Sequence, residues 1–453
     1  MMELSAEKVA GVAEERRIQP LYDVEDVPPL KEAVPLGIQH VLAMFASNVS
    51  VPITVAAAIG LSVADRAFLA QCAMLVAGIA SFVQARPVGP IGARLPVVMG
   101  TSSGFLPVCL SIAQQYGMAA LMGAAFVGGW LEVILGFFLK GLRRFFPPVV
   151  TGTVVLTIGL SLLPIGVKNA AGGIGAADFG SFSNLLLAGI VFVIVVVIHQ
   201  LGKGFLGASA ILIGTIVGFL VAIPMGKVDF TPVAEAGWFS FPNPLAYGMS
   251  FEWPAIMAML FMYIVTTVET VGDISGITMG GAGREATDKE LSGGIIADGF
   301  FSSFAAIFNA LPNTSFSQNV GLISFTGIMS NYVVKVGAVF LILCGLFPKI
   351  GALVACIPMP VFGGSLLIMF AFIATSGITL IVSGGLTKRN LLIVAASLSL
   401  GFGLSGVPEA MQYFPESVKL IFSGAGIVPA CIVALVLNLV LPQDERQNGT
   451  ARA

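Results

Sequence analysis

The chain has 453 residues, of which 57% are hydrophobic and only 10% are charged, and its formal net charge is −2 at pH 7. A soluble domain carries about 25% charged residues, so this composition excludes a large soluble protein, which could not cover its surface. The sequence offers no basic patch for nucleic acid. We therefore predict a protein whose main surroundings are a lipid bilayer.

Hydrophobic runs along the chain predict an all-α polytopic fold of about fourteen membrane segments. In the first half we expect segments at 36–58, 66–84, 95–113, 117–139, 146–166, 184–201 and 206–225. In the second half we expect segments at 252–279, 291–310, 312–329, 333–348, 352–382, 390–406 and 420–441. The third segment of each half is short and broken, and 352–382 is long enough to contain a bend.

The distribution of charged residues predicts the orientation. Residues 1–34 and 443–453 are polar and mixed in charge, and the first stretch lacks the apolar core of a secretory signal. With both tails inside, most Lys and Arg residues of the short loops fall on the cytoplasmic side. We therefore expect a multi-pass protein of the inner (cytoplasmic) membrane, with both termini in the cytoplasm.

The two short segments resemble each other. Leu95-Pro96 opens the first, Leu311-Pro312 opens the second, and small and polar residues precede a new apolar run in each. Broken segments at matching places in two halves are the best sequence indication of a transporter's binding site. Seven segments per half would make the halves inverted relative to each other. The alternative is that both breaks are ordinary loops that dip near the surface.

Few ionisable residues lie inside the predicted segments, where a charge costs about 2.5–3.5 kcal/mol on insertion scales. Glu269 and Asp273 are four residues apart and share a helix face. Glu269 is the strongest candidate, because a carboxylate can accept hydrogen bonds from the ring N–H groups of a flat polar ligand and suits a proton-coupled cycle. The alternative is a packing acid. Asp273 and Asp298 are structural or coupling candidates.

The second break contributes Gln318 and Asn319, where the start of a half-helix would point its free N–H groups into a midplane cavity. An amide offers both donors and acceptors to the edge of a nucleobase. Thr101 to Ser103 would supply the facing half-helix start. His199, at the end of segment 184–201, is interpreted as a membrane-interface residue. Two distant histidines and five dispersed cysteines predict neither a metal site nor an enzyme, and we expect no cofactor.

The run Gln318-Asn319-Val320-Gly321 with Thr326 resembles the signature of the nucleobase–ascorbate transporter family, also called nucleobase–cation symporter-2. Further marks of that family follow the same order along the chain: Gln39-His40, Glu269 with Gly272-Asp273, and Ala297-Asp298-Gly299. The resemblance extends from about Pro35 to Pro442.

The resemblance implies a seven-plus-seven inverted repeat, divided into a core domain that holds the substrate and a gate domain. The core would comprise 35–141 and 251–350, and the gate 142–250 and 351–442. The resemblance also implies a homodimer, elevator-like alternating access, and proton symport of a small nucleobase without any other cofactor.

Carried over by position, the resemblance implies that Glu269 and Gln318 bind the base, that Asn319 shapes the site, that His40 supports it and that Asp298 is needed for function. Further candidates for substrate contact are Ser102, Ser103, Phe105 and Ser317. Further candidates for support are Gln39, Asp273 and Thr326.

The substrate class follows from position 318, because relatives that resemble uracil transporters tend to carry Glu there. Gln318 therefore favours a purine such as xanthine or urate. Many relatives have a stacking Phe at the position of Ser103, so here either Phe105 stacks on the base or the ring rests on backbone and small side chains. A pyrimidine permease of the same family and an anion transporter of the same fold are the alternatives.

Overall fold

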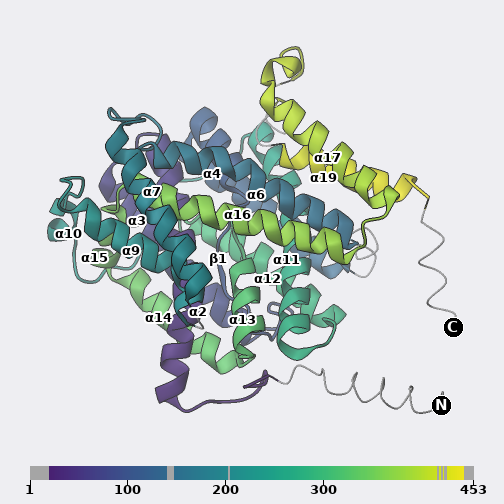
Figure 1. Cartoon of the computed structure of the whole chain (residues 1–453), viewed down its shortest axis with the longest axis horizontal. Helices are drawn as coiled ribbons and strands as arrows, with labels where there is room; N and C mark the ends of the chain where they lie inside the picture. The colour runs from purple at the N-terminus through teal and green to yellow at the C-terminus, as the bar shows by residue number, and fades with distance from the viewer. Residues whose placement is uncertain are drawn as a thin grey trace.

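The structure is a computed structural model, and it describes residues 20–139, 147–202, 205–415, 418–419, 422 and 426–442. It is helical apart from two short strands, β1 (Met99–Thr101) and β2 (Asn313–Ser315). Figure 1 shows β1 in the middle of the molecule with helices on all sides. The strands therefore lie where the two halves of the chain meet.

The helices follow the predicted segments closely. In the first half they are α2 (Leu30–Ala58), α3 (Val63–Ala85), α4 (Leu106–Phe137), α6 (Pro148–Ala170), α7 (Phe182–Leu201), α8 (Phe205–Ala208), α9 (Ala210–Ala222) and α10 (Thr231–Glu235). In the second half they are α11 (Trp253–Ala282), α12 (Asp288–Ile307), α13 (Ser317–Thr326), α14 (Asn331–Leu346), α15 (Pro348–Ala355), α16 (Met359–Ser383), α17 (Lys388–Gly406), the 3-10 turn η2 (Pro408–Met411) and α19 (Ile427–Val440). By length and hydropathy, eight described helices could each cross a membrane, or nine if the bent pair α14–α15 forms one span.

Some boundaries differ from the prediction for identifiable reasons. Gly117 has φ 81° and ψ 176° inside α4, and this break separates the predicted segments 95–113 and 117–139. The predicted segment 352–382 was wrong at its start, because its first residues belong to α15, which bends 82° from α14. Pro358 occupies the N-cap of α16 and divides the two helices. Part of the predicted segment 420–441 lies outside the described residues.

The two broken segments are joined to each other by an antiparallel strand pair. Met99 lies opposite Ser315, and Thr101 lies opposite Asn313. The pairing continues beyond the strands, because the backbone N–H of Ser102 donates to the carbonyl of Pro312 at 2.9 Å. Each strand follows a Leu-Pro step, and a residue before proline is restricted to extended backbone. The local sequence thus ends helical structure at both places, and the pairing satisfies the backbone that is freed.

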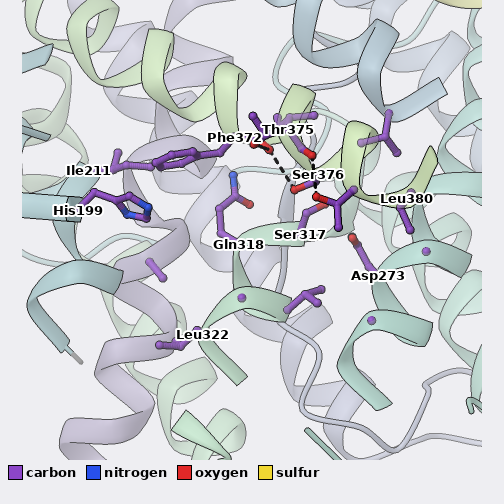
Figure 2. Close-up of a pocket in the computed structure, with 18 of the residues that line it drawn as sticks. His199, Ile211, Asp273, Ser317, Gln318, Leu322, Phe372, Thr375, Ser376 and Leu380 are labelled. Atoms are coloured by element: carbon purple, nitrogen blue, oxygen red, sulfur yellow. Dashed lines mark hydrogen bonds between the residues drawn. The ribbon is translucent and has the colours of Figure 1, made fainter. Parts of the chain in front are cut away.

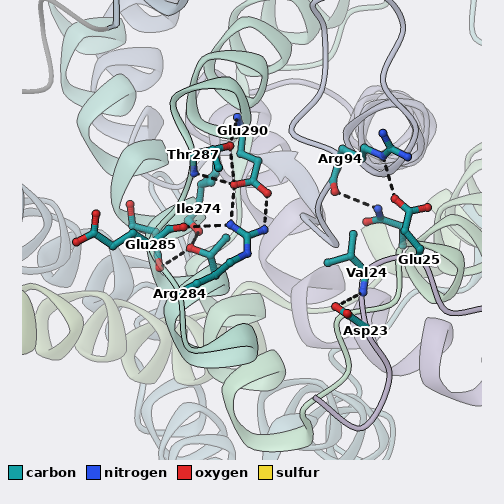
Figure 3. A network of polar contacts seen from close by, with 12 residues as sticks. Asp23, Val24, Glu25, Arg94, Ile274, Arg284, Glu285, Thr287 and Glu290 are labelled. Carbon is teal, nitrogen blue, oxygen red and sulfur yellow. Dashed lines mark hydrogen bonds and ion pairs between the residues drawn. The ribbon is translucent and has the colours of Figure 1, made fainter. Parts of the chain in front are cut away.

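The described N-terminal segment, residues 20–26, runs along the residues that follow α13. The N–H of Leu21 donates to the carbonyl of Gly327 at 2.7 Å, and the N–H of Met329 donates to the carbonyl of Tyr22 at 2.8 Å. Figure 3 shows the ion pair between Arg94 and Glu25 beside this segment. Both side chains of that pair are exposed, so the backbone hydrogen bonds rather than the ion pair hold the segment in place.

Helices α6 and α16 pack against each other through glycines. A Cβ atom on Gly159 would lie 2.4 Å from the backbone nitrogen of Ala374, and one on Gly377 would lie 2.3 Å from that of Leu156. The two helices approach this closely because these positions lack side chains. The predicted division into core and gate domains is not tested by this packing and stays a prediction.

We expect Gly159→Ala to destabilise the protein, because the added methyl group meets backbone atoms that cannot move aside. Overpacking of this kind costs about 1–3 kcal/mol. Gly189→Ala in α7 is the matched control, because a Cβ there meets nothing within 4 Å. Melting temperatures of both variants in detergent would test this. Equal changes in the two variants would contradict the close contact.

Candidate functional site

A cavity of about 600 Å³ lies where the second break opens into α13. Its wall is formed by residues of α11, α13, α16 and the end of α7 (Figure 2). Helix α13 begins at Ser317, and its N-cap residue Phe316 makes no side-chain cap hydrogen bond. Free N–H groups and the positive end of the helix dipole therefore lie at the cavity.

Two acids of α11 line this cavity. Glu269 is buried, and its carboxyl has no hydrogen-bond partner among the described residues. Asp273, one turn further along, accepts a hydrogen bond from the hydroxyl of Ser315 at 2.7 Å. A buried carboxyl without a partner is unfavourable, so Glu269 is the group that a bound ligand would satisfy.

Ser317 and Gln318, the first two residues of α13, complete this side of the cavity. The side-chain amide of Gln318 has no protein hydrogen-bond partner in the described part of the chain, and Figure 2 shows it standing free between Ser317 and His199. Gly321 lies one turn further, where an added Cβ would meet nothing within 4 Å. Donor and acceptor groups of Gln318 therefore remain available to a ligand.

Asn319 lies behind this wall rather than in it. Its amide oxygen is 2.6 Å from Nδ1 of His40, and its amide nitrogen donates to the carbonyl of Pro96 at 2.7 Å. Both side chains are buried. Because the amide is occupied at both ends, Asn319 holds α13 to α2 and to the first break. The structure thus places His40 and Asn319 in contact behind the cavity wall, and their expected roles in shaping and supporting the site stay predictions.

Asp298 of α12 is fully buried and organises the second break. It accepts hydrogen bonds from the hydroxyls of Thr270 and Thr314 and from the N–H of Ser315. Gln84 of α3 donates to its other oxygen at 3.2 Å. One carboxyl thus joins α3, α11 and β2, and Asp298 does not line the cavity.

The first break approaches the site from the other side. The Oγ of Ser102 is buried without a partner, and a Cβ on Gly104 would lie 3.4 Å from that oxygen and 3.5 Å from Oε2 of Glu269. Two unpartnered polar atoms therefore flank Gly104. Ser103 lies 3.3 Å from Ser47 through their hydroxyl oxygens.

Of the predicted site residues, only Glu269, Asp273, Ser317 and Gln318 line the cavity, and three that have not yet been placed lie away from its wall. Phe105 is 1% exposed, and its ring centroid is 4.7 Å from that of Tyr263, so in this conformation it packs in the core. Thr326 donates to the carbonyl of Leu322 at the far end of α13. Gln39 is buried on α2. The roles assigned to the site residues stay predictions.

The sequence analysis missed Glu132, which lies in the described part of α4. Its side chain is 1% exposed, and its Oε1 lies 3.3 Å from the hydroxyls of both Thr266 and Thr267. Its Oε2 has no partner. The signal was available, because Glu132 is an acid inside the apolar run 117–139.

His199, predicted to be a membrane-interface residue, lies near the end of α7 and also lines the cavity, so the structure adds a contact that the prediction did not include. Its ring centroid lies 4.4 Å from that of Phe372 on α16, which also lines the cavity. The sequence contained no signal for this pair, because the two residues are far apart in the chain.

The comparisons with known proteins identify the family of the chain. The family model Xan_ur_permease, described as "Permease family", matches residues 31–410. The xanthine permease of Bacillus subtilis is 40% identical over 89% of this chain and 92% of its own length. The uric acid permease PucK of Bacillus subtilis is 38% identical over 89% of this chain and 94% of its own length. The xanthine permease XanP of Escherichia coli strain K12 is 34% identical over 98% of this chain and 99% of its own length.

Solved structures share the fold at low identity. The transmembrane domain of the cyanobacterial bicarbonate transporter BicA matches with a TM-score of 0.53 at 13% identity, over 93% of this chain and all of that domain. The murine anion transporter Slc26a9 matches with a TM-score of 0.60 at 12% identity, over 91% of this chain and 69% of its own. The fold is an all-α membrane fold with a seven-plus-seven inverted repeat.

The match over most of the chain, together with these relatives, shows that this multi-pass membrane protein belongs to the xanthine/uric acid permease family and is a transporter rather than an enzyme.

Proposed function

We propose that this chain imports a purine nucleobase, xanthine or urate, by proton symport. The observation that carries the proposal is the cavity in which the unpartnered carboxyl of Glu269 and the unpartnered amide of Gln318 lie at the start of a broken helix. The names of the relatives, which are xanthine and uric acid permeases, support the same substrate class.

The chemistry of the two side chains is complementary to such a base. The carboxylate of Glu269 accepts hydrogen bonds from ring N–H groups, and the amide of Gln318 both donates to a ring carbonyl and accepts from an N–H. The N–H groups at the start of α13 and the hydroxyl of Ser102 add donors. Because the side chains of Glu269, Gln318 and Ser102 have no hydrogen-bond partners among the described residues, their pairing with a base gains hydrogen bonds without breaking existing ones.

The cavity wall argues against a small inorganic anion as substrate. Glu269 and Asp273 both line it, whereas no Lys or Arg does so among the described residues. A small inorganic anion would meet two acids there, whereas urate, although itself an anion near neutral pH, keeps ring N–H groups that can donate to a carboxylate. The anion transporters that share the fold therefore support the architecture and not the substrate.

The proposal assigns the coupling proton to Glu269. In the described part of the chain no ion pair involves this carboxyl. A charge buried without a partner is unfavourable, so a proton that enters with the base would neutralise the site for transport. Elevator-type movement of the core (35–141 and 251–350) against the gate (142–250 and 351–442) would then carry base and proton across.

The remaining features of the proposal concern the assembly and its place in the cell. We propose a homodimer in the inner membrane with both termini in the cytoplasm. The excess of Lys and Arg in the loops on that side supports the orientation. The cavity also reaches Gly202 and Gly207, beside a loop that this orientation places at the cytoplasm.

Cells that express this chain should accumulate radiolabelled xanthine or urate, and a protonophore should abolish the accumulation. Glu269→Gln should reach the membrane in normal amounts and lose accumulation, because the amide cannot exchange the coupling proton. Quantified protein in membrane fractions is the control. Uptake of uracil alone would contradict the purine assignment, and uptake that survives the protonophore would contradict proton symport.

Gln318→Ala should weaken purine binding, because it removes a donor and an acceptor from the site. Hydrogen bonds of this kind contribute about 0.5–1.5 kcal/mol each, so the affinity should fall roughly tenfold. Ser324→Ala is a matched control on the same half-helix, because that hydroxyl is exposed and bonds only to the carbonyl of Val320. Competition binding of labelled xanthine to purified protein would measure both, and equal affinities would count against Gln318.

A further inference from the structure

Residues of α7 and α16 form a further part of the cavity wall, which the proposed contacts of Glu269 and Gln318 do not use. We call His199, Phe372, Thr375 and Ser376 the α7–α16 wall; all four line the cavity. In the view of Figure 2, Gln318 stands between the His199–Phe372 pair on one side and Ser317 and Asp273 on the other. At about 600 Å³ the cavity is of the size that holds a drug-sized ligand. A nucleobase is much smaller, so one base at Glu269 leaves this wall free.

The α7–α16 wall combines two kinds of contact that suit a flat nitrogen heterocycle. Phe372 presents an aromatic ring at the cavity, on which a base can stack. His199 offers one donor and one acceptor in its neutral form. The hydroxyls of Thr375 and Ser376 donate to the backbone carbonyl of Phe372, so their oxygens can still accept from a ligand.

The contacts of His199 distinguish this wall from simple helix packing. A histidine that only joins two helices is normally buried and hydrogen-bonded. His199 is exposed, lines the cavity, and has no hydrogen-bond partner for either ring nitrogen among the described residues. Its ring meets that of Phe372 at 4.4 Å with an interplanar angle of 42°. The pair thus leaves polar atoms available on the cavity side.

The position of the wall places it on a route out of the site. His199 is near the end of α7, and Gly202 at the C-cap of α7 and Gly207 of α8 also line the cavity. The distribution of basic residues assigns this part of the chain to the cytoplasmic side. A base that leaves Glu269 and Gln318 for the cytoplasm would therefore pass His199 and Phe372.

We propose that His199 and Phe372 form a second, release-side subsite that takes the same flat nitrogen heterocycle after it leaves Glu269 and Gln318, and that this subsite helps to set which bases pass. The inference rests on the proposed function, since it assumes a nucleobase as cargo. Phe372 supplies the stacking surface that Ser103 and the buried Phe105 do not provide in this conformation.

The test uses purified full-length protein in proteoliposomes, with radiolabelled xanthine and urate as probes. Phe372→Leu keeps an apolar side chain of similar bulk and removes the aromatic face. His199→Leu removes the donor and acceptor, and His199→Gln restores them. Phe192→Leu is the matched control, because Phe192 lies on α7, is exposed and does not line the cavity. Exchange rates, equilibrium binding and melting temperatures are measured for each variant.

We expect Phe372→Leu and His199→Leu to slow exchange about tenfold, the size of effect that loss of one base-stacking contact produces. We also expect the ratio of xanthine to urate exchange to change in both. The affinity of equilibrium binding at Glu269 and Gln318 should stay within twofold of wild type. The melting temperature should stay within a few degrees of it. His199→Gln and Phe192→Leu should exchange at near the wild-type rate.

Each contrary outcome has a defined meaning. Wild-type exchange in both Leu variants would overturn the subsite. The subsite would also be overturned if the Leu variants lost exchange, binding and melting temperature together while the ratio of xanthine to urate exchange stayed unchanged. Loss of helix packing alone would explain that result. If the wild-type protein binds neither xanthine nor urate, both the proposed function and the subsite fail. If the wild-type protein binds and exchanges them and the Leu variants exchange at the wild-type rate, only the subsite fails.

Discussion

The structure depends on one constraint, namely that backbone polar groups freed inside a bilayer must find partners within the protein. Two segments break in the middle of the molecule, and β1 and β2 satisfy each other there. Side chains supply further partners for the backbone of the strands: Asn48 accepts from the N–H of Thr101 at 2.7 Å, and Asp298 accepts from that of Ser315 at 3.3 Å. The start of α13 at the cavity is a consequence of this pairing.

The site divides its polar groups into two sets. Asn319 and Asp298, which hold the break in place, have all their oxygens hydrogen-bonded. Glu269 and Gln318, which face the cavity, have no partners in the described part of the chain. A rigid support behind unpartnered groups is what a selective binding site requires, because the ligand then meets preorganised donors and acceptors.

The same division explains why the family residues are not all contacts. His40, on α2, is buried against Asn319 and does not line the cavity. Glu132 is buried behind α11, against hydroxyls of the turn that precedes Glu269. Polar residues in a membrane are therefore informative about a site even when they do not line it.

The sequence by itself determined the membrane class, the approximate helices and the two breaks. Charge content and hydrophobic length decide whether a segment can enter a bilayer, and the Leu-Pro steps at Leu95 and Leu311 end helical structure locally. The sequence also indicated Glu269 and Gln318 as candidates for substrate contact, because an uncompensated polar residue inside an apolar segment needs a reason; both line the cavity, and their role stays a prediction. Each of these inferences uses only residues close together in the chain.

Only the tertiary structure decided which of these residues meet. The pairing of β1 with β2, the contact of His199 with Phe372 and the burial of Phe105 against Tyr263 each join residues far apart in the sequence. Hydropathy reports the depth of a residue in a bilayer and not the direction of its side chain, so the sequence placed His199 near the end of a span but could not place it at the cavity. That direction is set by packing between helices, and it turned His199 toward the cavity.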